Sequence, residues 1–182
     1  MYIFKNNKYM KKLQVILFLT LLSISVMAQF PSQVKSLNVV PNEDFSVKGD
    51  LSNGFIIDDL SWASKSSVAC FPGTQNSKFR GKHVLYSMQL PAHSELKITV
   101  VPDNPDDNFS LYAYQIGATN YSTVPNLSSC VTCEADYKWD YPKRGKTQDH
   151  TRSVRLNAIS HNYNVVIGVA GAEGLNTGGY TL

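Results

Sequence analysis

Apolar and polar residues alternate with a period of two over much of the chain from residue 84 onward. The clearest segment is residues 95–100, in which Leu96, Ile98 and Val100 alternate with charged or hydroxyl side chains. Successive side chains of a strand point to opposite faces, so this segment is predicted to be a strand with one buried face. The same alternation predicts further strands over residues 84–90, 109–116, 154–158 and 163–169. In the last of these the other face is also apolar, which indicates a central strand covered on both sides.

Turn-forming residues separate these predicted strands. They lie at residues 91–93, 102–107, 160–162 and 171–179. The last of these segments is glycine-rich, and we interpret it as a hairpin between two strands. No segment after residue 28 keeps an apolar helical period for more than two turns. Strands of about eight residues joined by turns are typical of an all-β sandwich or barrel.

Weaker patterns predict earlier strands over residues 45–47, 55–57 and 67–71. Residues 117–150 are different, because these 34 residues show no clear strand pattern. A loop of that length is uncommon in a compact domain and is usually functional or partly structured. We therefore expect an all-β, antiparallel β-sandwich with a long, partly irregular insertion.

The first 28 residues have the composition of a secretory signal peptide. Four lysines precede fifteen uncharged residues, 13–27, and Ala28 ends a small-residue cleavage site before Gln29. A membrane anchor is the alternative, but fifteen helical residues span roughly 22 Å, less than the roughly 30 Å hydrocarbon core. We predict cleavage after residue 28 and a location in the periplasm, on the cell surface or outside the cell. No later apolar run is long enough to cross a membrane.

The formal charge of +3 comes from this leader. Residues 29–182 hold 13 basic and 14 acidic side chains, which gives a formal charge of −1. Nucleic-acid-binding domains normally carry a basic surface, so we expect no nucleic-acid partner. The 154 residues after the leader are enough for one buried core, and we expect a single domain over residues 29–182.

Several segments together resemble the bacterial pre-peptidase C-terminal (PPC) domain. The sequence GKHVLYSMQLP at residues 81–91 is followed by LKITV at 96–100 and FSLYAY at 109–114. The ending, NVVIGV at 164–169 and GYTL at 179–182, is similar to the closing pair of strands of that family. The resemblance covers residues 66–116 and 151–182.

The resemblance to PPC domains implies a jelly-roll-like β-sandwich that is usually attached to secreted hydrolases and has no catalytic residues of its own. Some members of that family bind collagen or polysaccharide. The chain departs from the family pattern in two respects, because no enzyme domain accompanies it and the cysteine-bearing insertion is not a general family feature.

The three cysteines predict one structural disulfide. Cys130 and Cys133 form a single CxxC pair, and Cys70 is the remaining thiol. A structural zinc site usually needs two such pairs, and a thioredoxin-like site would need a βαβ context. In an oxidising compartment we favour a bond from Cys70 to Cys130 or Cys133, which would attach the insertion to the sandwich. A bond within the CxxC pair and a metal site are the alternatives.

Residues 102–108 gather carboxylate and amide oxygens, the ligand type that calcium prefers. Asp103, Asp106 and Asp107 are the candidate metal ligands. Their spacing does not follow the EF-hand pattern, and the same residue types are common in solvated turns. We expect no cofactor, with calcium at this loop as the alternative.

Three aromatic residues alternate within the insertion. Tyr137, Trp139 and Tyr141 would share one face of an extended segment and could stack against sugar rings. Aromatic side chains also favour burial, so a strand packed on the sandwich is the competing interpretation.

No catalytic motif is present. The four histidines, at positions 83, 93, 150 and 161, belong to no recognisable motif, and there is no nucleophile elbow or paired-histidine helix. We expect a secreted, non-catalytic binding or accessory module that recognises extracellular polysaccharide or matrix protein. The alternatives are a calcium-dependent adhesion module and a small secreted hydrolase.

Overall fold

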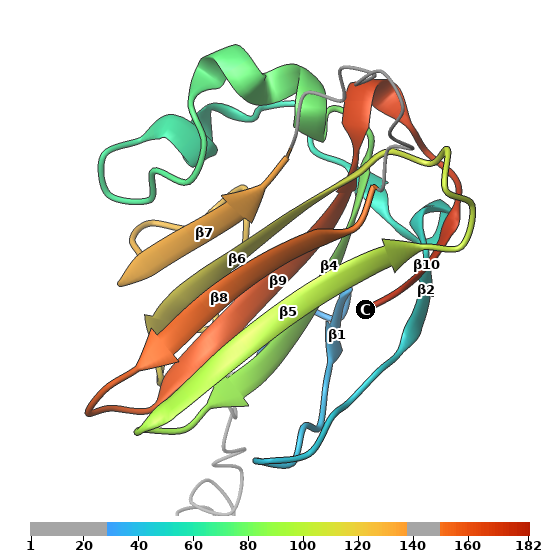
Figure 1. Ribbon diagram of the computed structural model, residues 1–182. Coiled ribbons are helices and arrows are strands. Elements are labelled where there is room, and N and C mark those ends of the chain that lie inside the picture. The colour runs from blue at the N-terminus through green and yellow to red at the C-terminus, as the bar shows by residue number, and fades with distance from the viewer. Residues whose placement is uncertain (1–28, 138–149) are drawn as a thin grey trace, which may run out of the picture.

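The computed structural model describes residues 29–137 and 150–182, and these form a sandwich of two β-sheets (Figure 1). The first sheet has the order β1-β4-β9-β6-β7, with β3 paired to β4. Its strands are β1 (Val34–Ser36), β3 (Phe55–Ile56), β4 (Lys82–Leu90), β6 (Phe109–Gly117), β7 (Thr132–Asp136) and β9 (Tyr163–Gly171). The second sheet has the order β2-β10-β5-β8. Its strands are β2 (Lys48–Asp50), β5 (Ser94–Pro102), β8 (Arg152–Ala158) and β10 (Gly179–Thr181).

The predicted all-β sandwich is therefore confirmed. The pairings of the described strands are antiparallel except for β1, which runs parallel to β4. Short 3₁₀ segments join the strands: η1 (Leu51–Asn53), η2 (Ser61–Ser64), η3 (Gly73–Phe79) and η4 (Ala172–Gly174). No helix within residues 29–137 and 150–182 has the length and apolar character needed to cross a membrane.

The main core lies between the two sheets. The predicted alternation holds, because Ile98 and Val100 of β5 are buried there. Across the gap they meet the inner faces of β4 and β9, which contribute Met88 and Ile167 among others. Burial of such side chains is the main favourable contribution to folding, at about 1.5–3 kcal/mol for each large aliphatic residue.

A second core covers the outer face of the first sheet, so the central strand β9 is buried on both faces as predicted. The covering layer consists of η2, η3 and neighbouring turns, drawn as green coils in Figure 1. Trp62 lies 5.5 Å from Tyr112 and 5.8 Å from Tyr114, measured between ring centroids. Phe71 stacks on Phe79 at 3.7 Å. These rings form what we call the aromatic cluster.

His83 is fully buried in the aromatic cluster as a neutral imidazole. Its Nε2 lies 2.8 Å from the carbonyl oxygen of Phe79, which can only accept a hydrogen bond, so Nε2 carries the proton. Nδ1 then accepts from the Tyr112 hydroxyl at 3.0 Å. Desolvation lowers the pKa of His83 from 6.5 to about 4, and the hydrogen bond to Phe79 opposes that shift only in part. The His83 imidazole therefore has a structural role, because both of its nitrogens are hydrogen-bonded within the aromatic cluster.

A disulfide joins Cys70 to Cys133, which confirms one of the two favoured pairings. Cys133 belongs to β7 and Cys70 to the covering layer, so the bond fastens that layer to the edge of the first sheet. Cys130 keeps a free thiol, whose Sγ lies 3.7 Å from the carbonyl oxygen of Ser67.

The structure corrects four expectations about single segments. Residues 67–71 form no strand, because they pack as turns against the outer face, with Val68 and Phe71 buried. Residues 45–47 also form no strand; Phe45 is 46% exposed, and β2 begins only at Lys48. The insertion contains a regular strand, β7, in a segment without alternation. Residues 171–179 form no hairpin, since they connect β9 of one sheet to β10 of the other.

The disulfide predicts a large effect on stability. Replacing both Cys70 and Cys133 by serine removes a cross-link between residues 63 positions apart. In the chain-entropy model this loss costs roughly 4 kcal/mol of unfolding free energy. Urea denaturation under non-reducing conditions measures the change. Cys130→Ser is the matched control and should leave the midpoint nearly unchanged; an equal loss in that variant would contradict the assignment.

Burial of the His83 imidazole predicts that the fold loses stability at acidic pH. The folded state resists protonation of His83, whereas the unfolded chain binds the proton below about pH 6.5. Stability contributed by the neutral ring is therefore complete above pH 6.5 and is lost as the pH falls toward about 4, by about 3 kcal/mol in total. Denaturant midpoints measured between pH 6.5 and about 4 should therefore fall as the pH falls. The variant His93→Gln, at an exposed turn residue, should keep this pH dependence. A His83→Gln variant with the same pH dependence would refute this origin.

Candidate functional site

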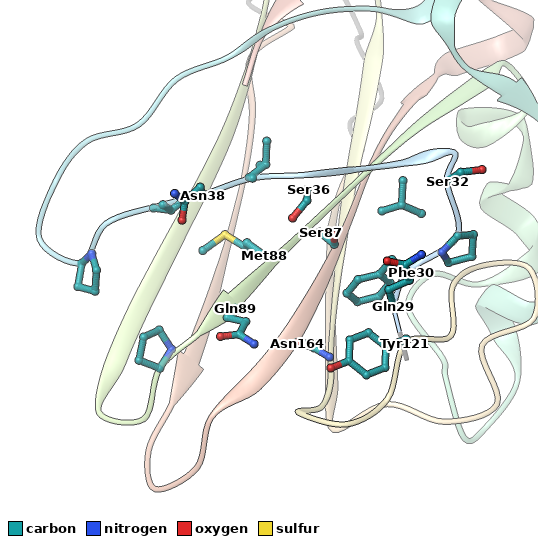
Figure 2. Close-up of a pocket in the computed structure, with 16 residues that line it drawn as sticks. Gln29, Phe30, Ser32, Ser36, Asn38, Ser87, Met88, Gln89, Tyr121 and Asn164 are labelled. Atoms are coloured by element: carbon teal, nitrogen blue, oxygen red, sulfur yellow. The ribbon is translucent and has the colours of Figure 1, made fainter. Parts of the chain in front are cut away.

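One end of the outer face of the first sheet is polar and open. A cavity of about 700 Å³ lies there, between the sheet and the segment that leads into and out of β1 (Figure 2). The residues that line it are Gln29, Phe30, Pro31, Ser32, Val34, Ser36, Leu37, Asn38, Val39, Pro41, Ser87, Met88, Gln89, Pro91, Tyr121 and Asn164. We call this cavity the amide-lined cavity.

The floor of the amide-lined cavity follows from the sequence of β4 and β9. Leu85 of β4 points outward into the covered core, but the next two residues on that face are Ser87 and Gln89. Gln89 is paired with Asn164 across the β4–β9 ladder, and Figure 2 shows the two amides next to each other. Ser87 is paired with Ser36 of β1. The outer face therefore changes from aromatic to amide and hydroxyl groups along a single strand.

Two aromatic rings form one wall. Phe30 and Tyr121 meet edge to face at 5.3 Å between ring centroids, and both line the cavity. The loop that carries Tyr121 is held by Asn164, whose amide donates to the carbonyl oxygens of Ala118 at 3.1 Å and Asn120 at 2.8 Å. Asn164 is 2% exposed, so burial and these two hydrogen bonds hold its side chain in one position.

The amide-lined cavity is polar but carries no side-chain charge in its described lining. None of the described residues that line it has a charged side chain, although the amides and hydroxyls supply both donors and acceptors. Such a site suits a neutral ligand that has many hydrogen-bonding groups. The predicted cleavage after Ala28 would add the α-amino group of Gln29 at the edge of this site.

The predicted aromatic platform is described only at its first residue. Tyr137 packs edge-on against Phe71 and Phe79, with centroid distances of 6.2 and 5.4 Å. It therefore belongs to the rim of the aromatic cluster. Trp139 and Tyr141 lie outside the described residues, and the platform stays a prediction.

The predicted calcium loop lies between β5 and β6. Asp103 forms an ion pair of 2.7 Å with Lys48, and Asp107 accepts a hydrogen bond of 3.3 Å from the Asn104 amide. The backbone N–H of Asp106 donates to the Asn104 side chain at 3.2 Å. Within the described part of the chain, no three His, Cys, Asp or Glu side chains are grouped to hold a metal ion. Calcium binding at this loop stays a prediction.

A serine–histidine contact occurs outside the cavity. Ser160 Oγ and His161 Nδ1 are 2.8 Å apart in the turn between β8 and β9, where both residues are exposed. No carboxylate of a described residue is hydrogen-bonded to His161. A base oriented by a third group, as nucleophilic catalysis requires, is therefore not assembled at this contact.

The amide-lined cavity could not be predicted from the sequence, because its residues come from four separate segments. One signal was present. Ser87 and Gln89 interrupt the apolar character of residues 84–90, and Asn164 does the same at the start of the next central strand. Of these three residues Gln89 is exposed, whereas Ser87 and Asn164 are buried polar groups.

No protein-family model matches the chain, and no curated protein does. Among solved structures, the chain is similar to the pre-peptidase C-terminal domain of collagenase from Bacillus anthracis. That similarity has a TM-score of 0.40 and 9% sequence identity, over 85% of this chain and 96% of that domain. The similarity is distant.

Proposed function

We propose that the protein is an exported, non-catalytic binding module and that the amide-lined cavity binds a neutral carbohydrate. The observation that carries the proposal is the composition of the cavity lining: amides, hydroxyls and two rings, with no charged side chain among the described residues. A volume of about 700 Å³ is within the usual range for a small-molecule site.

A carbohydrate fits this lining better than an ionic ligand does. Each sugar hydroxyl both donates and accepts, which matches the exposed side-chain amides of Gln89 and Asn38. The apolar C–H faces of a sugar ring match the rings of Phe30 and Tyr121. A cationic ligand would lose hydration on entry and would meet no opposite charge on the described lining residues.

The leader sequence and the disulfide both support export. The leader has the features of a cleavable signal, and the Cys70–Cys133 disulfide is typical of proteins that leave the reducing cytosol. The proposed ligand is accordingly an extracellular glycan.

Single substitutions in the cavity test this function. Gln89→Ala should weaken binding to a neutral glycan about tenfold, because the exposed amide is lost without disturbing the core. Tyr121→Ala should weaken binding by a similar factor through loss of a ring contact. Affinities are measured by calorimetry, with ligands selected on an array of neutral and charged glycans.

Gln33→Ala is the matched control, since this exposed glutamine lies between the lining residues Ser32 and Val34 but does not itself line the cavity. The control should bind with unchanged affinity, and all three variants should keep the melting temperature. A preference for charged glycans, or equal affinity in the Gln89 and control variants, would reject the proposed site.

A further inference from the structure

A groove runs along the side of the sandwich where β7 of the first sheet lies next to β8 of the second. Figure 1 shows these two strands side by side and pointing in opposite directions. The groove has a volume of about 460 Å³. One of its walls comes from residues 131–134 and the other from residues 155–160. We call it the β7–β8 groove.

Two hydrogen bonds between the sheets define which residues of the two walls lie at the same level. The N–H of Ser153 donates to the carboxylate of Asp136 at 2.8 Å. The Gln115 amide donates to the carbonyl oxygen of Asn157 at 3.2 Å, and Gln115 is paired with Thr132 of β7. Position 136 therefore lies opposite 153, and position 132 lies opposite 157.

The level between these two hydrogen bonds is charged. Glu134 on one wall lies opposite Arg155 on the other, and both side chains are exposed and line the groove. Neither forms an ion pair with a described residue. Arg155 is also paired directly with Lys97 in the β5–β8 ladder, where the like charges repel. The two walls thus carry opposite charges that are not paired within the described part of the chain.

One end of the groove is apolar. Ile159 is 73% exposed and Val131 is 58% exposed, the highest values among the large hydrophobic side chains of the described residues. Val131 precedes β7 and Ile159 follows β8, so they lie on opposite walls at the same end of the groove. Aliphatic side chains that gather around a cavity, instead of lying scattered, indicate an interaction surface.

We propose that the β7–β8 groove is the contact surface of a symmetric dimer, in which the β7 wall of each copy packs on the β8 wall of the other. A two-fold axis along the groove exchanges the walls and preserves each level. Glu134 of each copy then meets Arg155 of the second copy, and Val131 meets Ile159. The groove is complementary to itself at both its charged level and its apolar level.

Other occupants match the groove less well. A strand from another protein would need free backbone groups along β8, but Asp136 and Gln115 already bind those of Ser153 and Asn157. A small apolar ligand would cover the aliphatic side chains and leave both charges unpaired. A second copy supplies both opposite charges. No described residue lines both this groove and the amide-lined cavity, so the dimer does not depend on carbohydrate binding.

Sedimentation equilibrium of the purified protein should show a monomer–dimer equilibrium between micromolar and near-millimolar concentration. Ile159→Asp should weaken dimerisation at least about tenfold, because it places a charge in the apolar contact. Val40→Asp is the matched control. Val40 is 50% exposed and lies outside the groove, so this variant should dimerise with unchanged affinity.

Charge reversal tests the pairing across the axis. Glu134→Lys and Arg155→Glu each place like charges at both ionic contacts of a homodimer, and each should weaken it at least about tenfold. An equimolar mixture of the two variants restores opposite charges at both contacts and should form a heterodimer of nearly the original affinity. Glu43→Lys, the same substitution at an exposed position outside the groove, should dimerise normally.

A protein that stays monomeric over the whole concentration range would overturn the proposal. A dimer that Ile159→Asp leaves intact, or a mixture of folded charge-reversed variants that stays monomeric, would also overturn it. If a charge-reversed variant fails to fold, the comparison of Ile159→Asp with Val40→Asp decides the question. Since no glycan is present, failure here would leave the proposed carbohydrate site standing, and failure of that site would not change the mass measured here.

Discussion

The need to cover both faces of one sheet determines the architecture. The central strands β4, β9 and β6 carry apolar side chains on both sides, so the first sheet requires two covering layers. The second sheet covers the inner face, and 3₁₀ segments and turns cover the outer face. The outer layer ends before the sheet does, and the amide-lined cavity begins where the aromatic cluster ends.

Side chains of the first sheet protect the outer edge of β8. On β8, the N–H of Ser153 donates to the Asp136 carboxylate at 2.8 Å, and the carbonyl oxygen of Asn157 accepts from the Gln115 amide at 3.2 Å. Side chains of the first sheet thus occupy the edge of the second, which is a usual protection against unwanted strand addition.

Most of the fold could be predicted from local patterns, whereas the candidate site could not. Alternation identified the five long strands, because their buried faces are set by period two and by apolar residues such as Ile98 and Val154. It failed at residues 67–71, where the apolar residues serve a turn packed on a sheet, and at β7, where an edge strand has little alternation. The amide-lined cavity is formed by residues far apart in sequence, such as Gln89 and Asn164. Their proximity depends on the β4–β9 register, which no single segment encodes.

The unpaired thiol beside the disulfide has a consequence for covalent integrity. Cys130 is three positions from Cys133, near enough in sequence to attack the bridge and exchange partners. Only the thiolate attacks a disulfide, and partial burial raises the pKa of Cys130 above its ordinary value. At neutral pH the sulfur is therefore mostly protonated and a slow nucleophile. The fold therefore slows thiol–disulfide exchange between Cys130 and the Cys70–Cys133 bond.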